Sequence, residues 1–383
     1  MLELNAKLLA LRQHIEVLNE AARDKFKKAK DTWAISLLRS RLVPNVLETF
    51  KSPSHHALIW RQTIVTFVNE EGIDQGGLTA DMHSCFWREV LKPEHGLFEQ
   101  LEGAGACLPR TDADPDALMC VGRFLLKSVL DDHPTGPSLS AFILEYLCGA
   151  HETRAFSDEH PHRALQLLAN VDSTLAQNWN KLLHMPDDEL SASMLTLEDF
   201  DDSLPEEPLV QKNVARAVIA GCRRKLLVDR HASLAALHTG FTLGGKLDLG
   251  LQLAQHSNAD LSLLLQGNAD LSAEDLLQCF DWSEEPPCSP AVGYLRELIS
   301  TAALDKRLRL LLLRFCTGRN ALPLSGLSPK VTFNLLNTPG GLPEPHTCSH
   351  ELDLPIYSSK EVTRAKLVLA LDSFEVDGSF GQG

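Results

Sequence analysis

Apolar residues near the start of the chain recur at alternating spacings of four and three. They form one stripe on a helix, close to a heptad seam: Leu4, Leu8, Leu11, Ile15, Leu18 and Ala22. Such a stripe packs on its own domain or against a partner helix, and we favour the first. We therefore expect an amphipathic helical extension over residues 1–38, with a second helical stretch from Trp33 to about Phe50.

The following segment has the residue types of a β-strand. Residues 62–68 read QTIVTFV, which is rich in β-branched side chains. Gly72, Gly76 and Gly77 come next, and glycine tolerates positive φ, so we expect a tight structural turn. The spacing of these glycines is not that of a phosphate-binding loop. An amphipathic helix should follow, with these apolar residues: Met82, Phe86, Trp87 and Val90.

Helical patterns continue through the middle of the chain. Gly122 lies inside one of them, which indicates close packing against another helix. Residues 151–210 are irregular and acidic, with short helical patterns that predict a small inserted subdomain. Residues 213–241 read as one long amphipathic helix, and a further helix should end at Gly267. We place a hinge at residues 268–270.

The last part of the chain mixes helical and strand patterns. We expect a helix over residues 295–315 and a strand over residues 330–337. A capping-box sequence at residues 358–361 predicts the start of a final helix. Its expected inner face consists of Val362, Ala365 and Leu369. The fold class expected for the whole chain is therefore α+β.

Composition narrows the possible functions. The chain has 383 residues, which suggests more than one folding unit, and a formal net charge of −15, which argues against a nucleic-acid partner. It contains no apolar run of the ~18 residues that span a bilayer. The first residues are charged and do not resemble a secretory signal. We therefore expect no membrane span and an intracellular location, in the cytoplasm or the nucleus.

One cysteine stands in an unusual setting. The stretch 341–357 reads GLPEPHTCSHELDLPIY, in which Cys348 has polar and titratable neighbours. Pro343 and Pro345 cannot continue a helix or donate to a central strand, so the stretch should be an open loop. These features predict that Cys348 is a nucleophile.

Four roles of Cys348 can be compared. Its surroundings lack the ligand spacing of a zinc site, and a reducing compartment disfavours a disulfide. A protease nucleophile would need a distant base, which the sequence does not exclude. An acyl carrier needs less, because a thiol that attacks a thioester displaces a leaving group as good as itself. His346 would raise the thiolate fraction or would only hydrogen-bond to the backbone. The Thr347 hydroxyl or loop amides would stabilise the oxyanion, although Thr347 could equally only shape the loop.

The same loop resembles the catalytic loop of HECT-type ubiquitin ligases. The resemblance rests on Leu342-Pro343, His346-Thr347-Cys348, Leu352-Asp353-Leu354-Pro355 and Tyr357-Ser358-Ser359. Upstream segments resemble other parts of that family in the same order: 67–78, Gly122-Arg123, His160-Pro161, 213–241, 264–267 and 314–327. Together they cover the chain from about Arg39 to Gly383.

The resemblance implies a bilobal fold. Residues 39–267 would form a large, mostly helical N-lobe that contains the small subdomain at about 151–210. Residues 271–383 would form a smaller α/β C-lobe with the catalytic cysteine, joined through a flexible hinge at 268–270. Residues 1–38 would precede this catalytic unit.

The resemblance also implies the chemistry and the partners. A ubiquitin-conjugating enzyme would dock on the small subdomain and pass ubiquitin to Cys348 as a thioester. A lysine amine of a protein substrate would then take the ubiquitin, without a cofactor or a metal. Phe380, fourth from the C-terminus, would support this transfer, and Asp353 would orient the lysine or only cap the loop. The expected docking groove consists of Leu144, Leu147, Phe156, Leu165 and Leu168, which could equally be core residues.

Several residues depart from the family pattern. Ser349-His350 stands where the family usually has Phe-Asn, and Ala80-Asp81 replaces a basic-acidic pair. Residues 195–208 are shorter than expected, and Tyr294-Leu295 replaces an aromatic pair. The change at Ser349-His350 motivates an alternative function, that of an impaired module that binds conjugating enzyme or ubiquitin without turnover.

Overall fold

A computed structural model describes the chain from residue 32 to residue 377, together with Gln13. Within this range the following are not described: 53–54, 56–57, 71–73, 75, 101–104, 137–138, 150–155, 157–159, 245–257, 284–289, 302 and 324. The apolar stripe expected at residues 4–22 and the expected transfer residue Phe380 therefore lie outside the described residues. None of the helices in the described part has the length and apolar character needed to cross a membrane.

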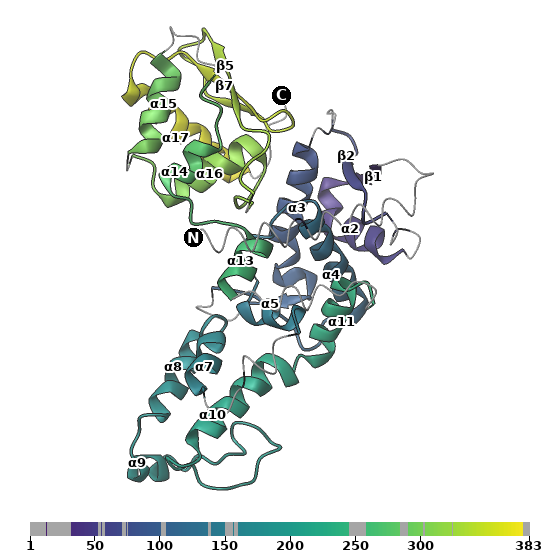
Figure 1. The fold of residues 1–383 in the computed structure, drawn as a ribbon, viewed down its shortest axis with the longest axis vertical. Helices are drawn as coiled ribbons and strands as arrows, with labels where there is room; N and C mark the ends of the chain where they lie inside the picture. Colours follow the sequence, from purple (N-terminus) through teal and green to yellow (C-terminus); the bar gives the residue numbers. More distant parts are fainter. Residues whose placement is uncertain are drawn as a thin grey trace.

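Helix and sheet are mixed, as expected for an α+β chain (Figure 1). Up to residue 147 the elements are β1 (Thr32–Leu37), η1 (Arg39–Arg41), α2 (Leu42–Lys51), β2 (Gln62–Phe67), α3 (Gly77–Val90), η3 (Pro93–His95), β3 (Phe98–Glu99), β4 (Leu108–Pro109), α4 (Pro115–Leu130) and α5 (Ala141–Leu147). The middle contains α7 (Pro161–Ala169), α8 (Ser173–Leu182), α9 (Asp187–Ala192), α10 (Val214–Arg223), η4 (Arg224–Val228), α11 (His231–Phe241) and α13 (Asn258–Gln266). The last part contains α14 (Ala273–Gln278), α15 (Pro290–Ser300), α16 (Lys306–Thr317), β5 (Thr332–Leu336), β6 (Glu344–His346), β7 (Glu351–Pro355) and α17 (Lys360–Asp377).

Buried apolar side chains form two clusters. The first cluster runs from Trp33 to Leu265, and the second runs from Leu271 to Phe374. In Figure 1 the elements of the second cluster, α14 to α17 with β5 and β7, lie together at the upper left. Helices α7 to α10 extend from the other elements toward the bottom of the view. The chain passes from one cluster to the other after Gly267, whose φ of +74° ends α13 in the left-handed conformation.

The first strand corrects a prediction from the sequence. Residues 33–37 are not helical, because β1 pairs in parallel with β2 over its whole length. Trp33, Ile35 and Leu37 are buried, whereas the residues between them are exposed. This alternation has the period of a strand and determines which side chains reach the core. The helix expected from Trp33 begins only at Leu42, as α2.

Two expected long helices are interrupted. Residues 213–241 form α10, the π-helical segment η4 and α11, with a break at residues 229–230. Residues 295–315 are divided between α15 and α16. The second break has a local cause, because the Asp305 side chain accepts a hydrogen bond from the Leu308 amide at 2.9 Å and caps the start of α16.

The final helix, α17, presents a different face to the core than predicted. Leu369 is 53% exposed and Ala365 is also exposed, so the expected inner face is wrong apart from the half-buried Val362. The buried positions are Thr363, Leu367, Ala370, Leu371 and Phe374. They follow the helical spacing of three, four and seven residues, displaced from the positions chosen from the sequence.

Helices α4 and α11 pack closely at two glycines. A Cβ atom on Gly122 would overlap the Leu237 carbonyl oxygen, and one on Gly240 would overlap the Met119 carbonyl oxygen. The close packing predicted at Gly122 is confirmed. Since both obstacles are backbone atoms, no side-chain rotation can make room for a methyl group.

We predict that Gly122→Ala destabilises the protein, because α4 and α11 must move apart. The expected loss is about 3 kcal/mol in the free energy of unfolding, measured by urea denaturation. Gly293→Ala in α15 is the matched control, because its Cβ would meet nothing within 4 Å. That change should stabilise the protein by about 1 kcal/mol. Equal effects of the two substitutions would contradict the packing argument.

Candidate active site

The cysteine stretch forms a turn between two strands. Strands β6 and β7 pair antiparallel, with His346 opposite Glu351, and residues 347–350 connect them. The prediction of an open loop is therefore wrong for residues 344–346 and 351–355, which form β6 and β7, and correct for the rest of the stretch. Pro345 is tolerated within β6 because β6 is an edge strand of the sheet ordered β5-β7-β6.

Asp353 holds an imidazole beside the turn. The His346 Nε2 atom lies 3.0 Å from Asp353 Oδ2, and Asn334 Nδ2 donates to Asp353 Oδ1 at 3.0 Å. The pair register makes His346 and Asp353 diagonal neighbours on β6 and β7, which explains the contact. The His346 side chain is 49% exposed, so its ring is accessible to solvent and to partners. The structure thus brings together two of the predicted site residues.

Cys348 is half-buried and Thr347 is buried. The Thr347 side chain forms a hydrogen bond to the cysteine sulfur that stabilises the thiolate. The Leu78 backbone amide, in the first turn of α3, also hydrogen-bonds to the sulfur. Amides at the start of a helix carry partial positive charge, which favours an anion at this position.

The start of α3 is part of the site, although the sequence indicated only a structural turn there. A Cβ on Gly77 would lie 2.5 Å from Cys348 Cα and would overlap the Thr347 carbonyl oxygen. Gly76 adopts a φ of +113°, which side chains rarely allow. Both glycines are therefore needed where the cysteine turn approaches α3. The signal in the sequence was the glycine pair directly before an amphipathic helix.

Carboxylates oppose the effect of the helix start on the cysteine. Asp74 Oδ1 accepts from the Gly76 amide at 2.8 Å, and Asp74 Oδ2 accepts from the Val65 amide at 2.7 Å. Asp81, one turn into α3, pairs with Arg39 at 2.6 Å. Burial raises the pKa of the Cys348 thiol, and the charges of Asp74 and Asp81 raise it further. The thiol form therefore dominates near neutral pH.

His350 has a structural role in the turn. Its φ is +55°, a left-handed conformation that histidine and asparagine adopt more readily than most residues. The ring is buried, with Nδ1 2.7 Å from the Pro329 carbonyl oxygen, and burial lowers its pKa. The imidazole of His350, which stands where the family usually has asparagine, is thus neutral near pH 7 and faces inward. Ser349 is exposed, and its hydroxyl donates to Glu351 at 3.0 Å.

The cysteine turn (residues 347–350) contacts the first apolar cluster. A second segment, which follows α16, is hydrogen-bonded to the same cluster. Asn320 Nδ2 donates to the Ser84 carbonyl at 2.9 Å, and Arg319 donates to the Asp132 carbonyl at 2.8 Å. The Ser325 hydroxyl donates to Asp132 Oδ2 at 2.7 Å. These bonds tie the segment after α16 to α3 and to the turn after α4.

The residues predicted to form a docking groove are all core residues. They are between 0% and 8% exposed and belong to the first cluster: Leu144, Leu147, Phe156, Leu165 and Leu168. A buried side chain cannot contact a docked partner, so we correct their assignment from a surface to packing. Apolar residues at helical spacing do not by themselves distinguish the two roles.

The other described cysteines differ from Cys348 in exposure. Seven are buried: Cys85, Cys107, Cys120, Cys148, Cys222, Cys279 and Cys316. Burial raises the thiol pKa of several of these, to about 12 at Cys222. Within the described ranges no group of three or more histidine, cysteine, aspartate or glutamate residues is arranged to hold a metal ion. Cys348 is therefore the most accessible nucleophilic thiol of the described part.

Comparison with known proteins identifies a single family. The model of the HECT-domain (ubiquitin-transferase) family matches residues 84–378. A bifunctional serine/threonine-protein kinase/NEDD4-like E3 ubiquitin-protein ligase of Dictyostelium discoideum is 30% identical over 67% of this chain and 13% of its own length. The mouse probable E3 ubiquitin-protein ligase HERC4 is 26% identical over 81% of this chain and 30% of its own length. Mouse E3 ubiquitin-protein ligase HUWE1 is 24% identical over 100% of this chain and 9% of its own length. The chain thus spans less than a third of each of these relatives.

We predict that the Cys348 thiol titrates above the pKa of about 8.5 typical of free cysteine. Asp74→Asn should lower its pKa, because the substitution removes a negative charge that disfavours the thiolate. The measurement is the rate of iodoacetamide alkylation of the Cys348 peptide against pH, by mass spectrometry. Exposed Asp188→Asn in α9 is the control and should leave the midpoint unchanged. A folded Asp74→Asn protein with the wild-type midpoint would contradict the assignment.

Proposed function

This chain belongs to the HECT-domain (ubiquitin-transferase) family, and we propose that it is a ubiquitin ligase acting through Cys348. Ubiquitin would arrive on a ubiquitin-conjugating enzyme, form a thioester with Cys348, and leave on a lysine amine of a protein substrate. The observation that carries the proposal is the position of Cys348, half-buried in the β6–β7 turn against the first turn of α3. We further propose that the protein acts in the cytoplasm or the nucleus.

In the first proposed step the Cys348 thiolate attacks the carbonyl carbon of the incoming thioester. The new carbon–sulfur bond forms a tetrahedral oxyanion, which collapses and releases the thiolate of the conjugating enzyme. The Leu78 amide and the Thr347 hydroxyl support this step because both stabilise the anionic sulfur of Cys348. The thioester already has a good leaving group, so no strong base is required.

In the second proposed step a lysine amine attacks the Cys348 thioester. The amine must lose a proton as the isopeptide bond forms and the Cys348 thiolate departs. His346, accessible and held by Asp353, is suited to accept that proton. Asp353 acts through His346, since the contact of 3.0 Å fixes the orientation of the ring. Phe380 remains our proposed support for this step from the family resemblance.

We propose that the two apolar clusters correspond to the N-lobe and the C-lobe, with a hinge at residues 268–270. The chain crosses between the clusters there, and Asn268 forms an antiparallel bridge with Leu322. Relative movement of the lobes would let Cys348 reach the conjugating enzyme and then the substrate. Residues 32–37 would belong to the N-lobe, because β1 packs into the first cluster.

We propose that the conjugating enzyme docks on the exposed side of the small subdomain formed by α7, α8 and α9. With the five predicted groove residues buried, another apolar contact is required. Met194, directly after α9, is 86% exposed. An exposed methionine is an adaptable apolar contact for a protein partner.

The alternative function, a binding module without turnover, depended on Ser349-His350. His350 supports the left-handed turn and does not remove the nucleophile, so this change gives the alternative no structural support. We therefore retain the ligase as the proposed function.

We expect a thiol-sensitive ubiquitin adduct when the protein is incubated with activating enzyme, conjugating enzymes and ubiquitin. Non-reducing gels should show that the adduct is lost in Cys348→Ala. Cys348→Ser should give a reductant-resistant ester, because serine replaces the thioester sulfur with oxygen. Cys120→Ala, a buried cysteine, is the control and should retain the adduct. An adduct that persists in Cys348→Ala would contradict the proposal that Cys348 carries the ubiquitin.

We expect Met194→Asp to slow adduct formation at Cys348 about tenfold without lowering the melting temperature. Residue 194 has a φ of +56°, which aspartate tolerates, so the backbone should be unaffected. Leu369→Asp on α17 is the control for an exposed leucine outside the subdomain. Leu165→Ala should instead destabilise the fold by about 2–5 kcal/mol, as expected for a core leucine. Normal adduct formation by Met194→Asp would place the docking surface elsewhere.

A further inference from the structure

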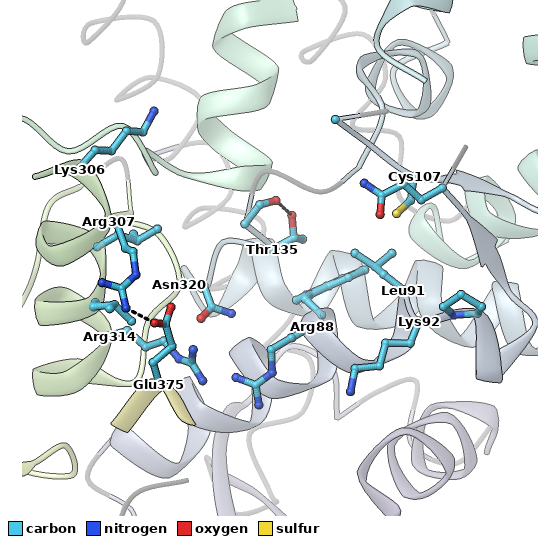
Figure 2. A pocket seen from close by; sticks show the side chains of 17 residues that line it. Arg88, Leu91, Lys92, Cys107, Thr135, Lys306, Arg307, Arg314, Asn320 and Glu375 are labelled. Carbon is cyan, nitrogen blue, oxygen red and sulfur yellow. Dashed lines mark hydrogen bonds and ion pairs between the residues drawn. The ribbon is translucent and has the colours of Figure 1, made fainter. Parts of the chain in front are cut away.

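A cavity of about 850 Å³ lies between α3 and α16 (Figure 2). Its walls come from both apolar clusters, because Trp87 belongs to the first and Leu311 to the second. Its size falls within the range of about 300–1,000 Å³ of small-molecule sites. The cavity is separate from the cysteine turn, whose residues do not line it.

The charged groups around the cavity are mostly cationic. Five cations and one carboxylate line it: Arg88, Lys92, Lys306, Arg307, Arg314 and Glu375. Figure 2 shows Lys306, Arg307 and Arg314 on one side and Arg88 and Lys92 on the other. An anion between the two sides would therefore be attracted to both.

Three of these cations already have carboxylate partners. Lys92 lies 2.6 Å from Glu89, and Lys306 lies 3.0 Å from Asp270. Arg307 lies 2.9 Å from Asp372 and also pairs with Glu375. These three side chains lie at the rim of the cavity. Their positive charges are largely compensated by the carboxylates with which they pair.

The remaining two arginines are poorly neutralised. Arg88 Nε lies 3.4 Å from Glu89, a carboxylate that it shares with Lys92. Among the described residues Arg314 has no ion-pair partner, and its guanidinium lies 5.2 Å from the centre of the Phe374 ring. Burial lowers the pKa of Arg314 and the charge of Arg88 lowers it further, whereas Cys85 and the charges of Asp81 and Glu375 raise it without offsetting the net decrease. Two guanidinium groups thus repel each other across the cavity, and an anion between them would relieve the repulsion.

The rest of the lining is largely apolar. Trp87 and Leu91 come from α3 and the residue that follows it, and Leu310 and Leu311 come from α16. The Trp87 indole N–H already donates to Ser128 at 3.1 Å, so it demands no partner within the cavity. A fully hydrated inorganic ion would leave this apolar surface unused. An apolar group with an anionic end fits both parts of the lining.

We propose that this cavity binds a small organic anion with a flat apolar body and a phosphate or carboxylate group. The anionic group bridges Arg88 and Arg314, and the apolar body lies against the half-buried Leu91 and Leu310. Guanidinium groups suit this role because they bind phosphate and carboxylate oxygens in bidentate fashion. One bound molecule contacts elements of both apolar clusters and therefore holds them in the arrangement seen here.

The consequence for activity rests on the proposed function. If ubiquitin transfer requires the lobes to move, occupancy of the cavity slows the transfer. Binding itself requires neither Cys348 nor ubiquitin, so the two proposals fail separately.

The test uses 1-naphthyl phosphate as the probe, with 1-naphthol and inorganic phosphate as its two halves. Isothermal titration with the whole chain should give one site for 1-naphthyl phosphate and at least tenfold weaker binding of either half. Arg88→Gln and Arg314→Gln should each weaken binding at least tenfold. Arg216→Gln, at an exposed arginine of α10 away from the cavity, should not change it.

Three results would overturn the site: no binding of 1-naphthyl phosphate, equal binding of 1-naphthol, or unchanged binding by folded Arg88→Gln protein. Arg88 lies at the edge of the cavity with 34% of its side chain exposed, so we expect Arg88→Gln to fold. This variant therefore tests the proposed site even if Arg314→Gln does not fold. Hydrogen exchange supplies a second readout. The probe should slow amide exchange at residues 267–272 in wild-type protein and leave it unchanged in Arg88→Gln.

Discussion

The approach of the cysteine turn to the first turn of α3 is the constraint on which the site depends. Thr347 and Cys348 lie so close to Gly77 that any side chain there would collide with their backbone. This contact brings an element of the second cluster onto the first and puts a helix amide beside the sulfur. The bonds from Arg319 and Asn320 fix the same arrangement a short distance away. The position of Cys348 and the charges around its sulfur thus have one structural origin.

The sulfur lies between opposing influences. The Leu78 amide and the Thr347 hydroxyl favour the thiolate, whereas burial, Asp74 and Asp81 favour the thiol. Asp74 also has a structural role, because it accepts hydrogen bonds from the Val65 and Gly76 amides. The carboxylate that shapes the start of α3 is therefore also one that restrains the cysteine. A thiol restrained in this way suits exchange with an activated thioester better than attack on an ordinary amide.

Local patterns predicted much of this structure, but contacts between distant segments lay beyond them. The strand at residues 62–67, the start of the final helix near residue 360 and the packing at Gly122 followed from residue type and spacing. Cys348 was singled out because prolines and polar residues surround it in the sequence, and its catalytic role stays a prediction. The role of Gly77 was missed because its neighbour is about 270 residues away in the chain. Leu144 and Leu165 were misassigned because an apolar helical face gives no information on what covers it. Strand β1 was missed although its alternation was present, since its partner β2 lies further along.

The burial of the other described cysteines determines which thiol of this protein reacts first with electrophiles and oxidants. Their sulfur atoms are withdrawn from solvent, and burial keeps many of them as thiols. Chemical damage from peroxide or reactive aldehydes should thus fall first on Cys348 within the described chain, the residue that we propose carries the ubiquitin. Under the proposed function, oxidation would then abolish ubiquitin transfer before the protein unfolds.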